Sequence, residues 1–466
     1  MDTPRPRIGI LPLYLALYDK VVPQHRPGRE AFARELADRL RGRGLDVELA
    51  DVCCVREEID RELLGLESRD IDLLATVHLA YSPSLEAADA VASFISAPLA
   101  LLDTTGAARF DESATRDDMF ANHGIHGVQD LAAVLKSIGR LHFVIAGHVA
   151  DEAFLDEVVA TARAALAARA FRDCITLLIG EPFQGMGDFA VDHDVLEDQH
   201  GPCTVRVDMK ELAARVAEIT DDDLDEEAEE DAERFDLSGV PPRVLRESNR
   251  VGCAIRSLID QADANAFTMN FQHFDRGLGT PTVPFLEASK AMARGIGYAG
   301  EGDVLTASFL AALMAGFGDA TFTEMFCPDW QGNTIFMSHM GECSLALAAA
   351  KPRIVEKDYA FGNVENPAVA LFPLRPGPAT LANMAPREDG TLPILAASVE
   401  ILDRGLSPNF PDVPHFWIRP RHCGLRDFLR LYSEAGGTHH LALLPGDHTD
   451  GLRRLAANMQ MEFTSL

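Results

Sequence analysis

The first half of the chain alternates between short apolar runs and longer amphipathic stretches. Apolar runs at residues 7–15, 71–79 and 97–104 are separated by stretches such as 29–44 and 84–95, in which apolar residues recur every three or four positions. Short apolar runs indicate buried strands, and a period of three to four residues indicates helices. Strands that alternate with helices predict a parallel sheet with helices on both faces.

The same alternation returns further along the chain. Residues 141–149, 151–171 and 174–180 predict another strand, helix and strand, and residues 203–219 predict a further strand and helix. From about residue 320 Pro, Gly and Asn become more frequent, and short β-like runs follow at 333–339, 368–374, 391–402 and 415–420. This change indicates a mixed, largely antiparallel C-terminal region. We therefore predict three domains, at residues 1–172, 173–318 and 319–466.

Length, composition and charge exclude several classes of protein. A chain of 466 residues is expected to form two or three domains. Its residues are 47% hydrophobic and 24% charged, and no apolar run approaches the roughly 20 residues that span a bilayer. A formal net charge of −30 repels phosphate backbones and anionic lipid surfaces. We expect neither a nucleic-acid partner nor a membrane partner.

Three local features complete this picture. The apolar run near the start is interrupted by Pro12, Asp19 and Lys20 and is followed by no small-residue cleavage site, so it predicts a first strand rather than a signal peptide. The eight cysteines form no C-x-x-C pair, which predicts reduced thiols and a cytoplasmic location. The acidic run at 221–236 indicates a solvated helix face or a flexible connection.

The motif GIGYAG at residues 295–300 matches the G-x-G-x-x-G fingerprint of dinucleotide-binding proteins. That fingerprint requires a preceding strand, so that the glycine turn delivers the pyrophosphate to a helix N-terminus. Here the preceding residues, 284–294, have a helical pattern. We therefore do not expect a nicotinamide cofactor at this motif.

Three other groups of residues are candidates for chemistry. Glu324 in TFTEMF and His339 in FMSHMGEC lie in apolar segments, where burial penalises an unpartnered charge and a bound metal ion would compensate for it. Glu301 precedes Asp303 and an apolar helix; taken alone, Asp303 would be an N-cap and Glu301 a loop charge. The third group is GGTHH at residues 436–440, where tandem histidines precede an apolar strand.

Together these groups supply two carboxylates and two imidazoles. That donor set suits Mn²⁺, Co²⁺ or Fe²⁺, with coordination positions left for substrate oxygens. No thiolate accompanies it, so a structural zinc site is not expected. The groups are far apart in the sequence, and spacing alone does not show that they converge.

Four segments resemble, in order, the successive signatures of the L-arabinose isomerase family. They are GYAGEGDVLTA at 297–307, TFTEMF at 321–326, SHMGEC at 338–343 and AGGTHH at 435–440. Weaker similarities at 266–274, 126–140 and 80–83 extend the resemblance toward the N-terminus. The resemblance implies doubly wound, Rossmann-like N-terminal and central domains, and a C-terminal domain that contains a β-barrel.

The resemblance also implies a site and an activity. The family's Mn²⁺ ligands match Glu301, Glu324, His339 and His440, and the substrate-binding residues that it implies are His126, Tyr81, Phe271 and His439. The two glutamates would catalyse aldose–ketose isomerisation of an open-chain sugar through a cis-enediol. Family members form hexamers of two trimers, so we expect a homo-oligomer, either a hexamer or a trimer, in which His126 reaches the substrate of the adjacent subunit.

Two segments depart from the family pattern. GILPLYLALY at 9–18 stands where the family has a glutamine-histidine-leucine-tyrosine pocket segment, and GEC at 341–343 is one residue shorter than its counterpart. The resemblance therefore implies a retained metal site and a divergent sugar pocket. The leading hypothesis is a cytoplasmic, metal-dependent ketol isomerase. The alternatives are a metal-dependent sugar epimerase, another enediol-type reaction at the same site, or a non-catalytic sugar-binding protein.

Overall fold

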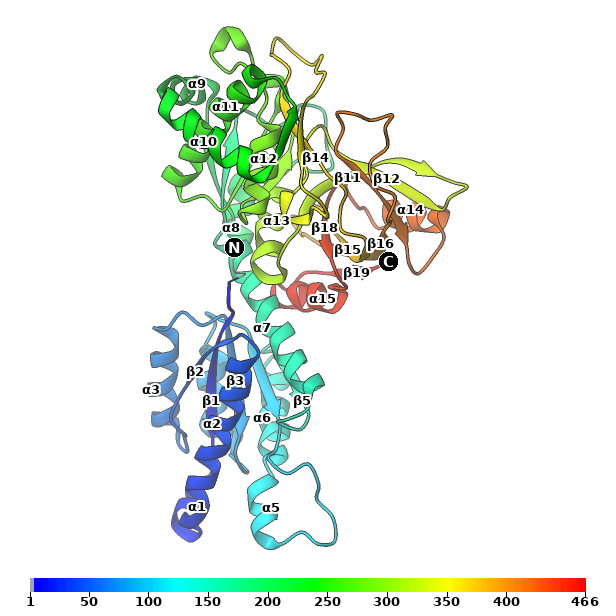
Figure 1. The fold of residues 1–466 in the computed structure, drawn as a ribbon. Coiled ribbons are helices and arrows are strands. Elements are labelled where there is room, and N and C mark those ends of the chain that lie inside the picture. Colours follow the sequence, from blue (N-terminus) through cyan, green and yellow to red (C-terminus); the bar gives the residue numbers. More distant parts are fainter. Residues whose placement is uncertain (1–3) are drawn as a thin grey trace. The chain divides into compact units, whose positions relative to one another are not determined.

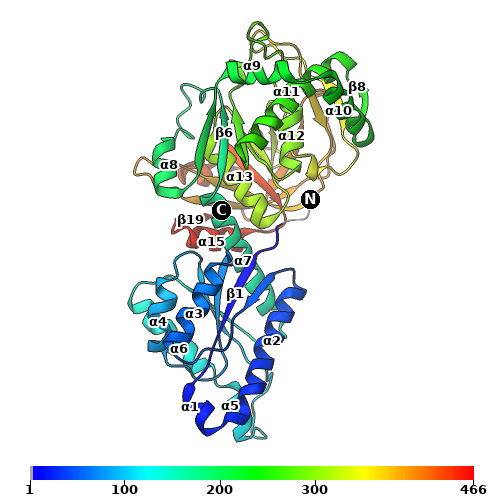
Figure 2. The ribbon, with the colours of Figure 1, turned by 90° about the vertical axis from the view of Figure 1, so that its left-hand side faces the viewer.

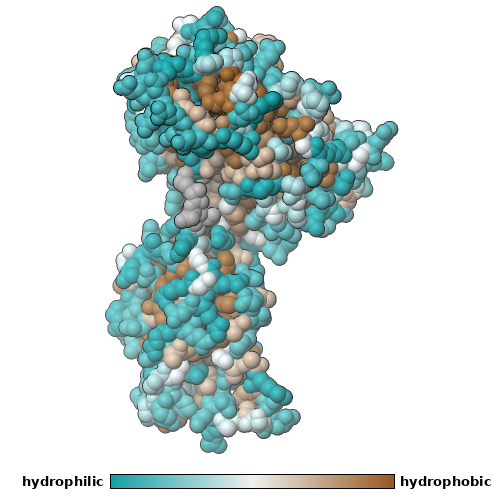
Figure 3. Space-filling view, viewed as in Figure 1, coloured by the Kyte–Doolittle hydropathy of each residue, from teal (hydrophilic) through white to brown (hydrophobic). Residues whose placement is uncertain are grey.

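The computed structural model describes residues 4–466, and the first three residues of the predicted N-terminal domain lie outside the described part. The chain divides into two compact units, residues 4–166 and residues 167–466, called here the N-terminal and the C-terminal unit (Figure 1). Within residues 4–466, no helix combines the length and the apolar character needed to cross a membrane. The visible surface of each unit is largely hydrophilic (Figure 3).

The N-terminal unit is built on a five-stranded, all-parallel sheet with the order β2-β1-β3-β4-β5. Its strands are β1 (Arg7–Leu13), β2 (Asp46–Leu49), β3 (Leu73–His78), β4 (Leu99–Asp103) and β5 (Phe143–Ala146). Its helices are α1 (Ala16–Val21), α2 (Arg26–Gly42), α3 (Arg56–Glu67), α4 (Ser84–Ser93), α5 (Arg116–Asn122), α6 (Ile125–Ser137) and the first part of α7 (Glu152–Arg172).

Both faces of this sheet are buried, as an apolar run without alternation predicts. Ile8 and Ile10 of β1 belong to one apolar cluster, which also contains residues of α2 and α7. Leu11 and Leu13 belong to a second cluster with residues of α3, α4 and α6. Figure 2 shows helices on both sides of the sheet. The sheet is therefore doubly wound, with its order reversing at β1.

The C-terminal unit contains a second parallel sheet, ordered β10-β9-β6-β7. Its strands are β6 (Ile175–Ile179), β7 (Cys203–Val207), β9 (Ala266–Met269) and β10 (Gly297–Gly300). The helices that accompany them are α8 (His193–His200), α9 (Met209–Glu218), α10 (Asp221–Arg234), α11 (Pro242–Ala262), α12 (Phe285–Ala293) and α13 (Val304–Phe317). The order of this sheet reverses at β6, and ligands of open α/β sheets bind at the carboxyl ends of the strands beside such a reversal.

A seven-stranded, mostly antiparallel sheet, here the mixed sheet, follows in the same unit, with the order β15-β18-β11-β12-β17-β16-β19. Its strands are β11 (Thr321–Asp329), β12 (Thr334–Ser338), β15 (Gly377–Met384), β16 (Ile394–Ile401), β17 (His415–Pro420), β18 (His440–Pro445) and β19 (Phe463–Ser465). Because β15 pairs with both β18 and β16, six of these strands form a closed circuit of hydrogen-bonded neighbours. Helices α14 (Leu425–Glu434) and α15 (Thr449–Asn458) belong to this part of the chain.

A small sheet completes the unit, with the order β14-β13-β8. Its strands are β8 (Asp236–Gly239), β13 (Arg353–Glu356) and β14 (Ala368–Leu371). Helix α13 contacts β9 and β10 of the parallel sheet as well as β15 and β18 of the mixed sheet. This explains why residues 304–317 are apolar on nearly all sides, since a helix of that composition has to be buried all round.

These sheets confirm the predicted fold class, with two parallel, helix-covered sheets followed by a mixed C-terminal sheet. The boundaries near residues 172 and 318 stay predictions. The segment before GIGYAG is indeed helical, as α12, and the last four residues of the motif form β10 rather than a phosphate-binding turn. This is the arrangement that argued against a dinucleotide site.

The acidic run forms a helix, α10, that is only partly solvated. Glu227 and Asp231 lie four residues apart on one face and are buried against the fully buried Lys290. The Nζ atom of Lys290 lies 2.7 Å from Glu227 Oε1 and 2.5 Å from Asp231 Oδ1. The helix is therefore held to α12 by a buried ionic contact, which the charge pattern alone did not predict.

We expect Lys290→Met to lower the free energy of unfolding of the protein by about 3–5 kcal/mol, because the buried Asp231 would lose its cation and Glu227 would keep only Arg256. Urea denaturation followed by circular dichroism measures this change. Lys210→Met, at an exposed lysine of α9, is the matched control and should leave the urea midpoint unchanged. Equal midpoints for the two variants would contradict a structural role of the buried contact.

Candidate metal and acid–base site

The candidate residues come together at the carboxyl end of the parallel sheet of the C-terminal unit and on three strands of the mixed sheet. Glu301 follows directly after β10, and Glu324 lies within β11. In the strand register, Glu324 is opposite His440 of β18 on one side and Ser338 of β12 on the other. His339 follows Ser338. Cross-strand neighbours of this kind have Cβ atoms about 5 Å apart, so the sheet pairing itself places Glu324 beside His440, and His339 is one residue beyond the other neighbour.

Glu301 lies in a strained turn. Its φ of 64° is in the left-handed region, which costs a residue with a side chain of the order of 1 kcal/mol and is typical of functional sites. Glycines flank it for steric reasons. A Cβ on Gly300 would lie 2.7 Å from Cε1 of His339, and a Cβ on Gly302 would lie 2.5 Å from Cα of Pro182. Any side chain at position 300 or 302 would therefore collide with neighbouring atoms, and the two glycines allow the turn that carries Glu301.

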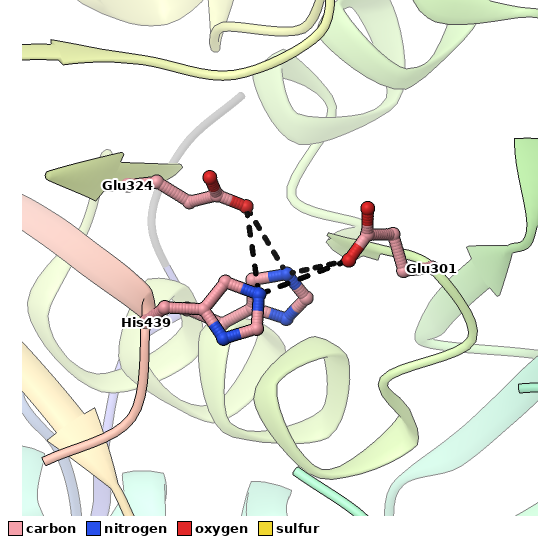
Figure 4. Close-up of side chains that lie close together, drawn as sticks. Glu301, Glu324 and His439 are labelled. Carbon is pink, nitrogen blue, oxygen red and sulfur yellow. Dashed lines mark ion pairs between the residues drawn. The ribbon is translucent and has the colours of Figure 1, made fainter. Parts of the chain in front are cut away.

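Four side chains converge on one space. Glu301, Glu324, His439 and His440 each offer one ligand atom, and these atoms lie within 4.8 Å of one another. His440 Nε2 is 3.2 Å from Glu324 Oε1 and 3.5 Å from Glu301 Oε2. Figure 4 shows Glu301 and Glu324 directed toward the imidazole of His439 from opposite sides. Two carboxylates and two imidazole nitrogens therefore face one another at one site.

His339 borders this group on the side of Glu324. Its Nε2 atom lies 3.3 Å from Glu324 Oε1, and its ring is in edge contact with that of His440, with centroids 6.2 Å apart. His339 does not belong to the set of four whose ligand atoms are all mutually close. The fourth member of that set is His439. Its Nε2 atom lies farther from the carboxylates, 3.8 Å from Glu301 Oε2 and 4.0 Å from Glu324 Oε1.

Two atoms at the centre of the site are buried and make no hydrogen bond within the described residues. They are Oε2 of Glu301 and Nε2 of His440. The two atoms are within ion-pair distance, but the alignment is not that of a hydrogen bond. Buried polar atoms without a partner cost roughly 1–3 kcal/mol each. A divalent cation between them would satisfy both atoms, and carboxylate and imidazole donors are the ligands that Mn²⁺, Fe²⁺ or Co²⁺ accept.

A second layer of carboxylates holds the histidines from behind. Asp303 Oδ2 accepts a hydrogen bond from Nδ1 of His440 at 2.8 Å, and Glu342 Oε2 accepts one from Nδ1 of His339 at 2.7 Å. Each imidazole therefore directs Nε2 toward the site. Metal-binding histidines are oriented in this way by carboxylates on their other nitrogen. Asp303 is also the predicted N-cap of α13, because its Oδ1 accepts a hydrogen bond from the backbone N–H of Thr306 at 2.8 Å.

The electrostatics of the site keep Glu301 ionised. Burial raises the pKa of the Glu301 carboxyl, but the neighbouring His439 and His440 lower it more, to about 2. Burial lowers the pKa of His440, yet hydrogen bonding to Asp303 and the nearby carboxylates raise it well above its ordinary value. Neighbouring groups of opposite charge thus outweigh the effect of burial at both Glu301 and His440.

The remaining predicted residues fall in two places. Tyr81 and His126 lie in the N-terminal unit, where their rings make an edge contact with centroids 6.4 Å apart, and His126 is exposed. Phe271 begins a short 3-10 turn after β9, at the same end of the parallel sheet as Glu301. Its ring contacts that of Phe183, whose backbone N–H donates to the Glu301 carbonyl at 2.8 Å. His439 lies beside His440 at the start of β18.

The sequence did not point to several residues that support the site. Glu342 was noticed only as part of a shortened segment, and Asp303 only as a cap. Asp188 and Phe189, in the loop after β6, were not singled out; Asp188 binds His439 and Phe189 stacks on His440 with centroids 4.8 Å apart. A carboxylate that follows an apolar strand in a parallel sheet, as Asp188 does some residues after β6, is the available signal.

Most of the chain is similar to known proteins. The model of the L-arabinose isomerase central domain matches residues 196–317, and that of the L-arabinose isomerase C-terminal domain matches residues 319–462. Together they match more than half of the chain. L-arabinose isomerase of Nocardioides sp. is 28% identical over 73% of this chain and 70% of its own. The L-arabinose isomerase of Herpetosiphon aurantiacus is 26% identical over 70% and 66%, and that of Anoxybacillus flavithermus 24% over 75% and 71%.

We expect Asp303→Asn to weaken the binding of a divalent cation about 10–100-fold, because the acid that orients His440 loses its charge. Titration calorimetry with MnCl₂ after removal of bound metal measures the affinity. Asn remains a good N-cap, so the thermal midpoint should change little. Asp208→Asn, at the N-cap of α9, is the matched control and should bind the cation as the wild type does. An unchanged affinity in Asp303→Asn would contradict this role.

Proposed function

The chain belongs to the L-arabinose isomerase family, and from that premise we propose that it is a metal-dependent ketol isomerase that interconverts an open-chain aldose and a ketose. The observation that supports this most directly is the convergence of Glu301 and Glu324 on the Nε2 atom of His440. A site that only bound a sugar would need neither a second carboxylate nor buried atoms without hydrogen-bond partners, such as Glu301 Oε2 and His440 Nε2. Retention of this group also argues against a non-catalytic protein.

The reaction moves a proton between C2 and C1 while the hydroxyl and carbonyl oxygens exchange roles. One of Glu301 and Glu324 takes the proton from C2 and returns it to C1, so that a cis-enediol forms in between. The other transfers the hydroxyl proton from one oxygen to its neighbour. Proton transfer by positioned groups of this kind typically contributes about 10²–10⁴-fold to the rate. The two carboxylates lie on either side of one space, as such a pair of transfers requires.

We propose that Glu301, Glu324, His339 and His440 hold the cation, and that the cation is Mn²⁺. When bound, it supplies Lewis-acid polarisation of the two substrate oxygens and stabilises their negative charge. The second-layer acids Asp303 and Glu342 keep the imidazole Nε2 atoms directed at the same point. Phe322 packs edge-on against both histidine rings, with centroids 4.8 and 4.9 Å away, and excludes water from that side.

We propose a class of sugars as the substrate and not one sugar, because a segment of the N-terminal unit departs from the family pattern. The segment GILPLYLALY, residues 9–18, contains no glutamine, and its polar contacts therefore differ from those of the family pattern. We propose a pentose, a hexose or a related sugar as the substrate. All eight cysteines are free, which supports a reducing compartment, and we propose the cytoplasm.

A panel of aldoses and ketoses tests this function. The panel should include arabinose, galactose, fucose and tetroses, assayed after EDTA treatment with and without added Mn²⁺. The proposal expects conversion of an aldose to a ketose only when Mn²⁺ is present. An inverted stereocentre with the carbonyl unmoved would identify an epimerase instead. Tight Mn²⁺ binding without any turnover would contradict the proposed isomerisation of these sugars.

We expect Glu301→Gln and Glu324→Gln each to lower turnover by about 10²-fold or more, because the amide cannot accept the proton. Initial rates with the best sugar of the panel measure this effect. Circular dichroism and size-exclusion chromatography should show an unchanged fold and assembly. Asp329→Asn, an exposed acid at the end of the same strand β11, is the matched control and should keep full turnover. A glutamine variant with near-normal turnover would remove that carboxylate from the mechanism.

We propose further that the protein is a homo-oligomer in which His126, with Tyr81, completes the site of a neighbouring subunit. Mixed assembly of two inactive variants tests this. We expect His126→Ala and Glu324→Gln chains, refolded or coexpressed together, to regain about a quarter of wild-type activity, as random mixing in a closed ring predicts. Each variant alone should stay inactive. Failure of mixed oligomers to gain activity would show that each chain supplies its whole site.

A further inference from the structure

One loop of the C-terminal unit contacts both histidines of the GGTHH segment, His439 and His440. The loop follows β6 and contains Asp188 and Phe189 in succession. Asp188 Oδ2 accepts hydrogen bonds from the backbone N–H of His439 at 2.9 Å and from the ring Nδ1 of His439 at 2.7 Å. Phe189 stacks on the ring of His440, with an interplanar angle of 7°. The loop and the histidine pair are 251 residues apart in the sequence, so the contact is a property of the fold.

The two bonds to Asp188 determine where the other ring nitrogen of His439 points. The backbone bond fixes the residue relative to the carboxylate, and the Nδ1 bond fixes the rotation of the ring. Nε2 is left directed at the space between Glu301 and Glu324 (Figure 4). It lies 3.8 Å from Glu301 Oε2 and 4.0 Å from Glu324 Oε1. Both distances are too long for a hydrogen bond, so Nε2 has no partner of that kind on either carboxylate.

His439 differs from its neighbour in its access to solvent. The His440 side chain is fully buried, whereas that of His439 is 38% exposed. Of the imidazoles around the site, His439 is thus the one that a small molecule can reach from outside. In His439 one ring nitrogen is hydrogen-bonded to Asp188 and the other faces the site. Such a nitrogen is suited to bind a hydroxyl, because a hydroxyl both donates and accepts hydrogen bonds.

We propose that Asp188 is a positioning residue, which holds His439 so that its Nε2 atom hydrogen-bonds a hydroxyl group of the bound sugar. This inference rests on the proposed isomerase function and adds to it the residue that orients the substrate at the open side of the site. Asp188 does not touch the sugar itself. It acts through His439, and both of its contacts are made with the same oxygen atom of the carboxylate.

The proposal predicts a specific kinetic pattern. A hydrogen bond that His439 makes to the sugar both before and during the reaction contributes to binding, and its loss raises KM while kcat changes little. We expect Asp188→Ala and His439→Ala each to raise KM about tenfold, which is the effect of one hydrogen bond. Since Asp188 acts only through His439, the double variant should be no worse than either single variant. Mn²⁺ affinity should stay within about twofold of the wild type in all three.

Asp192→Asn is the matched control. Asp192 lies in the same loop and caps α8, and its side chain accepts hydrogen bonds from the backbone of Asp194 and Val195. Asparagine is an equally good cap, so this variant removes one negative charge four residues from Asp188 without touching His439. KM should equal that of the wild type. An unchanged KM in Asp188→Ala, or tenfold effects that multiply in the double variant, would overturn the proposal.

Proton magnetic resonance separates this proposal from the proposed function. The Nδ1 proton of His439, held by Asp188, should give a downfield signal in wild type and Asp192→Asn that is lost in Asp188→Ala and His439→Ala. Binding of ribitol, a polyol that cannot be isomerised, to the Mn²⁺-loaded protein should weaken about tenfold in the same two variants. If the wild type isomerises no sugar, these two readouts still decide: a persistent signal or unchanged ribitol affinity in Asp188→Ala overturns the role of Asp188.

Discussion

The site depends on two carboxylates beside imidazoles, of which Glu301 is buried and Glu324 largely buried. Glu301 and Glu324 both approach His440 Nε2, at 3.5 and 3.2 Å. Like charges this close repel each other, and burial penalises each of them. A cation between them, as we propose, would remove both penalties. The unpartnered Oε2 of Glu301 and Nε2 of His440 face this space, and the strained turn at Glu301 directs the carboxylate into it.

The three histidines around this space share one arrangement. His339, His439 and His440 each donate Nδ1 to a carboxylate, with distances of 2.7, 2.7 and 2.8 Å. These anchoring acids are Glu342, Asp188 and Asp303. Each bond turns an Nε2 atom toward the carboxylates at the centre. Preorganisation of this kind places these nitrogen atoms before anything binds, which lowers the ordering cost of binding.

Two kinds of sheet supply the residues of the site. The parallel sheet delivers Glu301 and the Asp188 loop from its carboxyl edge, where ends of neighbouring strands meet. The mixed sheet delivers Glu324 and His440 as direct cross-strand partners. Helix α13 lies against both sheets, and its capping residue Asp303 binds His440. The apolar, non-amphipathic helix α13 thus joins the two sheets that carry the site residues.

Much of this was readable from the sequence, because burial leaves a pattern. Alternating runs predicted the parallel sheets, and Glu324 and His339 were conspicuous as charged or polar residues in apolar segments. The supporting acids were not, since Asp188 follows a glycine in an irregular loop and its partner His439 is 251 positions away. Glu342 lies three residues from His339 without a helix to align them. Contacts set by chain topology leave no local pattern.

Anomalous diffraction at the manganese edge, from crystals soaked in MnCl₂, tests the central claim most directly. The account predicts one peak per chain, about 2.0–2.4 Å from Glu301 Oε2, Glu324 Oε1 and His440 Nε2, distances typical of oxygen and nitrogen ligands. It also predicts that His339 completes the ligand set while His439 stays outside it. A protein with no peak among these residues, or with the peak at another group of side chains, would contradict the account.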